Sequence, residues 1–376
     1  MANVVERESR VNPNTWSAQT AIYSPEFEIT NRDLVRLFKQ TEVRTTTGRR
    51  VTQKDIVRRT GIDLRHSLQP LGEQLLFRAE IIPWMANQVA QEVIEKKGWE
   101  EVDCLFTSTS LPYRESLSRR VASYLWESSG IPVHEVFLDT HAECTSPVLI
   151  FHIIRENSEH FLRHPKIVIV ASEYITSIAS RLNMSLLSDG AAAIAFNYGD
   201  DLKVLGSAGK YFPELKHLIR APIKKENLPP EGCLFFIDVE QPRGQIDNGE
   251  NEVSGLQMEY GEIESGVLKW ALQRDTFPPL IEESLRMAEI EADQVDLVIP
   301  HKANGRITKG LKELLPNYGI RAPIYSNIRH QGNAGSVSII QATHEAKLRG
   351  RIKKGRHILY IGFGAGMLAV TAIVQM

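Results

Sequence analysis

The stretch VDCLFTSTS at residues 102–110 decides the fold, because a similar stretch, VDLVIPHKA, returns at residues 295–303. Each is a run of apolar and β-branched residues typical of a buried strand, and each precedes a segment with helical periodicity. The aspartates near the start of the two stretches, Asp103 and Asp296, lie 193 positions apart.

A second pair of strands repeats with nearly the same offset. KIVIVASE (166–173) corresponds to HILYIGFG (357–364), and Ile167 and Ile358 lie 191 positions apart. A nearly constant offset over successive elements predicts an internal duplication, with two similar α/β halves.

The division of the chain follows from this duplication. We assign residues 1–204 to an N-terminal half and residues 256–376 to a C-terminal half. Residues 205–255, rich in Pro, Gly and Asn, fit neither half and are predicted to be an insertion. The predicted strands are residues 102–110, 133–140, 166–173, 191–199, 295–303, 322–328, 357–364 and 368–376. The predicted helices are residues 83–98, 114–130, 305–315 and 337–350, and another that begins at Pro147. This alternation indicates parallel α/β sheets, with a site between the halves at the carboxyl ends of strands.

Composition excludes several classes of function. The chain has 376 residues, and its 44 Lys and Arg nearly balance its 46 Asp and Glu, for a net charge of -2. This balance argues against bulk binding to nucleic acid or to an anionic membrane. No apolar run approaches the ~18 residues of a spanning helix, and no signal peptide is evident. Three cysteines make no disulfide framework, so we expect a cytoplasmic protein with reduced thiols.

Cys144 is the cysteine whose surroundings suggest chemistry. It follows the predicted strand 133–140 and precedes the helix that Pro147 opens. Unpaired N–H groups and the positive dipole end of a helix stabilise a thiolate and can hold an oxyanion. Cys144 is therefore either a nucleophile or a small residue that fills a strand–helix junction. Cys104 and Cys233 lie within apolar runs and are predicted to be core thiols.

A nucleophilic cysteine needs a base or a cationic partner. His301 ends a predicted strand, and His330 stands in the loop after the next one, so the duplication makes both candidates for a cluster with Cys144. A structural role for each histidine stays open. GFGAG (362–366) lacks the full G-x-G-x-x-G spacing and predicts a turn that presents N–H groups rather than a dinucleotide loop.

Five short motifs resemble, in order along the chain, those of the β-ketoacyl-acyl-carrier-protein synthase III family in the thiolase superfamily. PHKANGRI (300–307) is similar to the family's P-H-Q-A-N-x-R-I, and GNAGS (332–336) is similar to its G-N-T-S-A-S. The other similar motifs are RTGI (59–62), SDGA (188–191) and GFGAG (362–366).

The resemblance implies the thiolase fold, a duplicated five-layered αβαβα architecture with mixed sheets, usually as a homodimer. Cys144 would accept the acyl group, and His301 and Asn333 would complete a Cys-His-Asn triad that stabilises the enolate of a decarboxylating malonyl unit. The backbone N–H groups of Cys144 and Ala365 would form the oxyanion hole.

The resemblance also implies how substrates bind. Asn304 would contact the pantetheine arm, and Arg59 and Arg306 would lie at the mouth, where phosphate or carrier protein docks. Tyr113 matches an aromatic residue that reaches across the dimer into the neighbour's acyl pocket. The implied substrates are thioesters of acyl carrier protein or CoA, and neither a cofactor nor a metal is implied.

Several residues depart from the family pattern. Glu143 occupies the position before the nucleophile, which is usually a small residue in the family. Its carboxylate could modulate the thiol, act as an extra base or point away from the site. Asp55 replaces the tryptophan that stacks on the CoA adenine. These departures, with the larger 205–255 insertion, predict a specialised relative.

We therefore predict an acyltransferase that joins the acyl group on Cys144 to a malonyl-type thioester by decarboxylative Claisen condensation, in specialised fatty-acid or polyketide metabolism. One alternative is an acyltransferase on the same scaffold that passes the acyl group to an alcohol or amine. A second is a non-catalytic subunit of a heterodimeric synthase. The retained Asn333 favours condensation.

Overall fold

The computed structural model describes most of the chain. The described residues are 17–41, 44–45, 48–71, 80–110, 116–140, 143–177, 185–212, 275–364 and 367–376.

The first sheet has five strands in the order β1-β7-β6-β4-β5. Its strands are β1 (Gln19–Tyr23), β4 (Val102–Ser108), β5 (Val133–Thr140), β6 (Lys166–Glu173) and β7 (Gly190–Asn197). Strands β5, β4 and β6 are parallel, whereas β7 and β1 are each antiparallel to their neighbours. The sheet is therefore mixed rather than wholly parallel.

The second sheet repeats this pattern with four strands in the order β8-β11-β10-β9. They are β8 (Lys203–Tyr211), β9 (Leu297–Pro300), β10 (His357–Gly364) and β11 (Leu368–Gln375). Again β9 and β10 are parallel, and β11 and β8 are antiparallel. The predicted strand 322–328 forms only one parallel bridge, from Ile324 to Val298, at the position that β5 holds in the first sheet.

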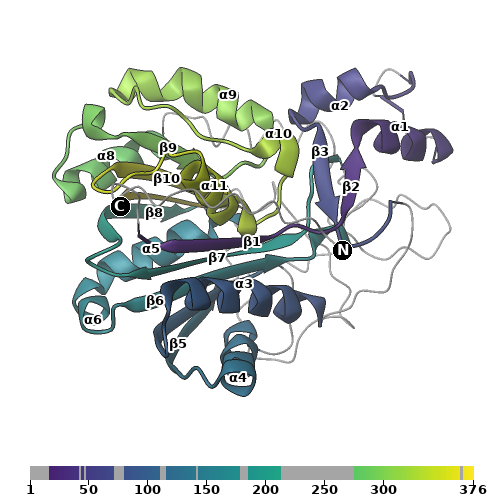
Figure 1. The fold of residues 1–376 in the computed structure, drawn as a ribbon. Helices are drawn as coiled ribbons and strands as arrows, with labels where there is room; N and C mark the ends of the chain where they lie inside the picture. The colour runs from purple at the N-terminus through teal and green to yellow at the C-terminus, as the bar shows by residue number, and fades with distance from the viewer. Residues whose placement is uncertain are drawn as a thin grey trace.

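Helices complete five layers (Figure 1). Helices α3 (Ile81–Lys97) and α4 (Leu117–Ser129) cover the outer face of the first sheet, and α8 (Phe277–Ala288) and α9 (Gly305–Leu314) cover that of the second. Between the sheets lie α5 (Ser146–Glu156) and α11 (Val337–Leu348). Because α11 is buried on nearly all sides, it is apolar around much of its circumference, as expected of a central helix. This is the duplicated αβαβα thiolase fold.

A smaller lobe lies beside the layers (Figure 1). Strands β2 (Phe27–Thr30) and β3 (Leu64–Ser67) pair antiparallel. Thr30 and Thr52 each begin a helix with a capping box, in which the threonine and an acidic residue satisfy each other's backbone N–H groups. These helices are α1 (Asn31–Gln40) and α2 (Gln53–Thr60). The remaining described elements are α6 (Ser158–Arg163), α10 (Ile328–Gln331) and the short turns η1 (Glu143–Thr145), η2 (Ile175–Ser177), η6 (Ala292–Gln294) and η7 (Leu315–Tyr318).

The predicted boundary between the N-terminal half and the insertion, after residue 204, falls within β8. Residues 205–211, within the predicted insertion, belong to β8 and pair with β11 at the edge of the second sheet. Residues 213–274, which hold the rest of 205–255, lie outside the described residues. The assignment of halves to residues 1–204 and 256–376 stays a prediction.

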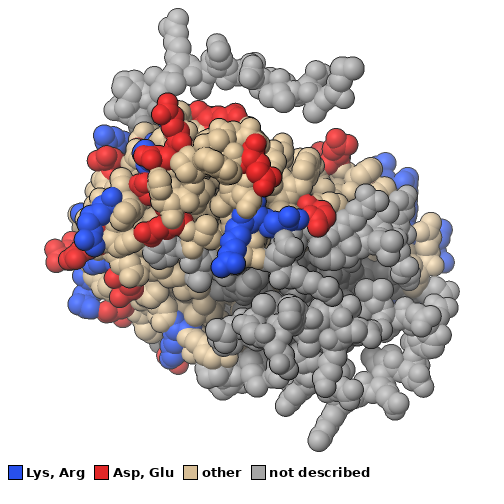
Figure 2. Space-filling model, turned by 90° about the horizontal axis from the view of Figure 1, so that it is seen from below, with Lys and Arg blue, Asp and Glu red and all other residues tan. Residues whose placement is uncertain are grey.

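The surface carries charges of both signs. On the face shown in Figure 2, lysines and arginines alternate with acidic side chains instead of gathering into one patch. Among the residues that the structure describes, no helix combines the length and the apolar character needed to cross a membrane.

Candidate active site

The turn that carries Cys144 lies between a strand and a central helix. Strand β5 ends at Thr140, η1 follows, and α5 begins at once at Ser146. The Cys144 thiol is partly buried, and the end of β10 lies against it: a Cβ built on Gly364 would stand 3.2 Å from the Cys144 Cβ and 3.3 Å from its backbone N. Only a residue without a side chain fits there easily, so β10 approaches the turn with its bare backbone.

His301 lies at the end of β9, the strand that pairs with β10. It directly follows β9, and its backbone N–H donates to the carbonyl of Ile361 at 2.7 Å. Its buried ring packs edge to face on Phe363, with centroids 5.1 Å apart. Burial, with the nearby Lys302 charge, lowers the pKa of His301 to about 3. The imidazole is therefore neutral near pH 7, and its Nδ1 has no hydrogen-bond partner within the described part of the chain.

Asn333 is held by hydrogen bonds on three of its groups. Its backbone N–H donates to Leu186 O at 2.9 Å, and its carbonyl accepts from Ser188 N at 2.8 Å. Its side-chain Oδ1 accepts from the N–H of Gly335 at 3.1 Å. Because Oδ1 is engaged, the amide presents its Nδ2 hydrogens as donors.

Glu173 fixes the loop that carries Asn333, and the sequence analysis missed it. The carboxylate ends β6 in full burial, which raises its pKa. It accepts from the N–H and hydroxyl groups of Ser110 (3.0 and 2.7 Å) and of Ser336 (3.0 and 2.5 Å). Ser110 follows β4 and Ser336 precedes α11, so one side chain joins both halves behind the site. The available signal was an acidic residue at the end of an otherwise apolar strand.

Lys302 is a buried cation beside His301, where the family motif has Gln. Its side chain has no exposed surface, and Nζ donates to Gln341 Oε1 of α11 at 3.1 Å. Burial lowers the pKa of Lys302 to about 7, although the nearby Glu345 favours the charged form. Glu345 also pairs with His330 at 3.0 Å. His330 thus takes part in a network behind the site, and no contact in the described residues places it beside Cys144.

Replacing Lys302 by glutamine should stabilise the protein by about 1–3 kcal/mol, because a buried charge with one neutral partner is costly. Between about pH 7 and 10.5 the unfolded chain holds the Lys302 proton and the folded chain does not, so wild-type stability rises with pH there. The gain from Lys302→Gln should therefore be largest at or below pH 7. Urea unfolding at about pH 6 and about pH 9.5 measures this. The exposed Lys309→Gln change is the control, and an equal gain at both pH values would contradict this explanation.

The predicted binding residues lie where α2 meets α9. Asn304 caps α9 through Oδ1, which accepts from the N–H groups of Arg306 and Ile307 at 2.9 and 3.2 Å. Arg306 is exposed on α9, and Arg59 is half-buried on α2. The two helices touch through backbone: a Cβ on Gly61 would lie 2.8 Å from the Cα of Gly305. Arg59 on α2 and Arg306 on α9 therefore lie on two helices that are in contact, and the buried Asn304 begins the second of them.

Asp55 does not act as an isolated negative charge. Its carboxylate completes the capping box of α2 and pairs with Arg49 at 2.5 Å and with Arg58 at 3.5 Å. Asp55 therefore presents no isolated negative charge to a nucleotide phosphate, and its place in the motif implies only that the ring which stacks on the CoA adenine is missing.

Other predicted site residues fall outside what the structure describes. Tyr113 and Ala365 are not among the described residues, and of Glu143 only the backbone, in η1, is described. Cys144 lies against Gly364 and His301 packs on Phe363, so both contact the last residues of β10, and Lys302 links the end of β9 to the helix that follows Asn333. The three predicted catalytic residues thus lie on elements that meet at the carboxyl ends of β9 and β10.

Comparison with known proteins agrees with this architecture. Residues 285–376 match the family model described as 3-oxoacyl-[acyl-carrier-protein (ACP)] synthase III C terminal. The β-ketoacyl-[acyl-carrier-protein] synthase III 2 of Bacillus subtilis is 26% identical, over 94% of this chain and 96% of its own. The 3-oxoacyl-[acyl-carrier-protein] synthase III of Aquifex aeolicus superposes with a TM-score of 0.70 at 21% identity, covering 95% of this chain and 98% of that one. A priming β-ketosynthase from a polyketide biosynthetic pathway superposes with a TM-score of 0.69 at 19% identity, covering 98% of each chain.

Proposed function

We propose that this chain, which is β-ketoacyl-acyl-carrier-protein synthase III-like, is an acyltransferase that forms a carbon–carbon bond by decarboxylative condensation. The observation that carries the proposal is the pair of neutral donors at the site. Asn333 has its Oδ1 engaged, so its Nδ2 hydrogens are available, and the buried His301 stays uncharged near pH 7. Two neutral donors suit an enolate oxygen, whose negative charge develops only during the reaction.

In the first half-reaction the Cys144 thiolate attacks the carbonyl carbon of an acyl thioester. The new Sγ–C bond forms, the carbon–sulfur bond to CoA or carrier breaks, and the leaving thiol takes up a proton. Cys144 lies just before the start of α5, where the positive end of the helix dipole favours the thiolate and the oxyanion. We propose that the N–H of Ala365 supplies the second donor of the oxyanion hole.

In the second half-reaction a malonyl-type thioester loses CO₂ and leaves an enolate. Hydrogen bonds from His301 and Asn333 would stabilise its oxygen. The carbanion attacks the acyl carbon on Cys144, the carbon–carbon bond forms, and the Cys144 thiolate leaves. Neither step requires a cofactor, so we propose that the chain works on thioesters alone, as a homodimer in specialised fatty-acid or polyketide metabolism.

The competing function is transfer of the acyl group to an alcohol or amine. It would use the same acylated Cys144 but would not need enolate stabilisation, so the ordered donor of Asn333 favours condensation. A non-catalytic role is disfavoured because Cys144, His301 and Asn333 are all present. The deciding experiment supplies acylated protein with a malonyl thioester and measures CO₂ release alongside product mass. Transfer to an alcohol or amine without CO₂ release would establish the competing function.

We expect at least one donor to arrive on a carrier protein. Arg306 is exposed on α9 beside Arg59 of α2, and such basic groups suit the acidic surface and phosphopantetheine of a carrier. Arg306→Ala should lower kcat/KM about 3–10-fold for the carrier-bound donor, with a smaller loss at high salt because the contact is screened. Steady-state kinetics with the same acyl group on carrier and on CoA measure this.

Arg286→Ala is the matched control, because Arg286 is an exposed arginine on α8 that pairs with Glu283. Its kcat/KM should stay at the wild-type value with both donors. Equal efficiency of the two donors in the wild type, or an unchanged Arg306 variant, would contradict a carrier docking site.

A further inference from the structure

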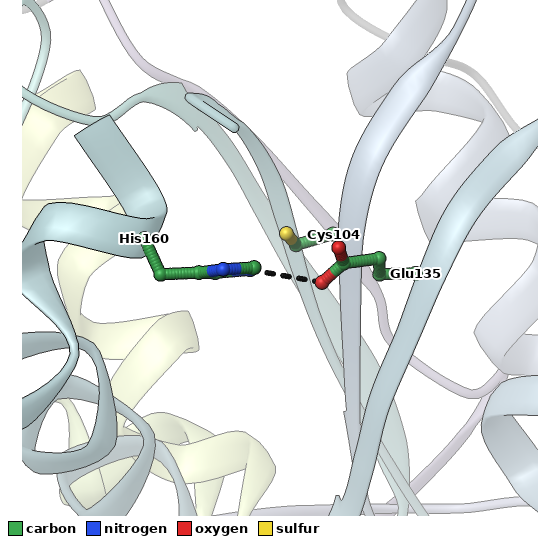
Figure 3. Close-up of side chains that lie close together, drawn as sticks. All are labelled: Cys104, Glu135 and His160. Carbon is green, nitrogen blue, oxygen red and sulfur yellow. Dashed lines mark hydrogen bonds and ion pairs between the residues drawn. The ribbon is translucent and has the colours of Figure 1, made fainter. Parts of the chain in front are cut away.

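Three side chains with metal-binding atoms converge on elements of the first sheet and on α6, outside the η1 turn that carries Cys144. Cys104 lies on β4, Glu135 on the neighbouring β5, and His160 on α6, and their ligand atoms all lie within 4.8 Å of one another. In Figure 3 the carboxylate of Glu135 points toward the ring of His160, and the Cys104 sulfur lies close to both. His160 Nε2 and Glu135 Oε2 are 2.9 Å apart.

The environment of this trio suits a metal better than that of the trio beside it. Glu101, Asp103 and His134 also lie close together, but Lys166 already engages both carboxylates, with Nζ on Glu101 at 2.7 Å and its backbone N–H on Asp103 at 2.9 Å. By contrast, within the described part of the chain, Glu135 pairs only with His160. Its charge is therefore not balanced by a lysine or arginine there.

We propose that Cys104, Glu135 and His160 form a binding site for Zn²⁺ or a similar borderline transition-metal ion. Thiolate sulfur, imidazole nitrogen and carboxylate oxygen are the three ligand types that Zn²⁺ prefers in proteins. Three protein ligands leave a fourth tetrahedral position for water. Access for that water exists on one side, because the side chains of His160 and Glu135 are 31% and 36% exposed while Cys104 is fully buried.

When the metal binds, it replaces the proton of the Cys104 thiol. The Cys104 S–H bond breaks, the proton passes to solvent, and a sulfur–metal bond forms without any change of oxidation state. His160 binds through Nε2, so the proton of its neutral ring must reside on Nδ1. The metal takes the place of the direct His160–Glu135 hydrogen bond.

The site would add a metal link among three elements that the β4–β5 strand pairing and the His160–Glu135 hydrogen bond already connect. It would tie β5, the edge strand of the first sheet, to β4 and to α6. Strand β5 leads directly to the η1 turn that carries Cys144, so the metal would steady the strand that precedes the nucleophile. This predicts a stabilising role rather than a chemical one.

The test uses the full chain with Cys144→Ser, which removes the active-site thiol, after metal removal with a chelator. Titration with Co²⁺ should reveal about one strongly bound ion per chain and a thiolate-to-cobalt charge-transfer absorption, and Zn²⁺ should displace it. Adding Cys104→Ser should abolish that absorption. Adding His160→Gln or Glu135→Gln should weaken binding at least ~10-fold. Glu101→Gln, in the neighbouring trio, should leave affinity and absorption unchanged.

Cys104 is a core residue, so its variant must first show wild-type circular dichroism. If it does not fold, the partly exposed His160→Gln variant decides, through affinity and through the rise in melting temperature on adding Zn²⁺, which should occur in the parent alone. Charge-transfer absorption that survives in a folded Cys104→Ser variant would overturn the proposal. So would equal affinity and equal thermal stabilisation in the parent and His160→Gln.

Discussion

A Cys144→Ser variant will gain no acyl mass when incubated with an acyl-CoA, whereas the wild type will gain one acyl group. A serine hydroxyl keeps its proton near pH 7, so the variant has no anionic nucleophile for the N-terminus of α5 to stabilise. Removing a covalent nucleophile costs on the order of 10⁶ in rate. Intact-protein mass spectrometry measures the outcome directly.

Cys104→Ser is the matched control for this experiment. Cys104 is fully buried, and desolvation with nearby carboxylates raises the pKa of its thiol to about 12, so it is unreactive toward thioesters. The Cys104 variant should therefore acylate like the wild type. Acylation that persists in Cys144→Ser would remove Cys144 from the mechanism.

Asn333→Ala should separate the two half-reactions. The variant keeps the Cys144 turn and the backbone bonds of residue 333, so we expect acylation at the wild-type rate. Decarboxylation of a malonyl thioester should fall ~10²–10³-fold, because the enolate loses one of its two donors. Stopped-flow acylation and CO₂ release from the pre-acylated protein measure the two steps separately.

Asn317→Ala, a change in an exposed asparagine of η7, should alter neither step. If Asn333→Ala lost acylation and decarboxylation in equal proportion, Asn333 would serve the integrity of the site and not the enolate. If decarboxylation were unchanged, Asn333 would have no part in the second half-reaction.

Local sequence patterns made several of the strands predictable. The segments 133–140, 166–173 and 357–364 are strands with these bounds, and the strand predicted over 102–110 spans Val102–Ser108. The segments 166–173 and 357–364 are largely apolar because both faces of the sheet are covered there, whereas the edge segment 133–140 also carries polar side chains.

The edge strand β1 was not predicted, because its pairing depends on residues distant in sequence. The residues of β1 lie outside every strand predicted from the sequence, yet they pair with residues of β7 that lie 168–176 positions later. The segment 322–328 has strand character but makes only a bridge at Ile324.

The residues of the candidate site also differ in how far the sequence predicted them. Cys144, His301 and Asn333 could be proposed because short motifs with fixed spacing surround them. Glu173 and Lys302 could not, because their significance comes from burial and from partners such as Ser336, just before α11, and Gln341, on α11. A carboxylate or an ammonium group looks like a surface residue until the fold encloses it.

The central helices also set an order for synthesis on the ribosome. Helix α5 comes from the first half, yet it packs against β8, β10 and β11 of the second sheet. Strand β11 begins at Leu368, 222 positions after α5 begins at Ser146. At about 5–20 residues per second, the apolar surface of α5 waits roughly 11–44 seconds for its last native neighbour. During that interval the apolar surface of α5 lacks part of its native cover and is prone to aggregation.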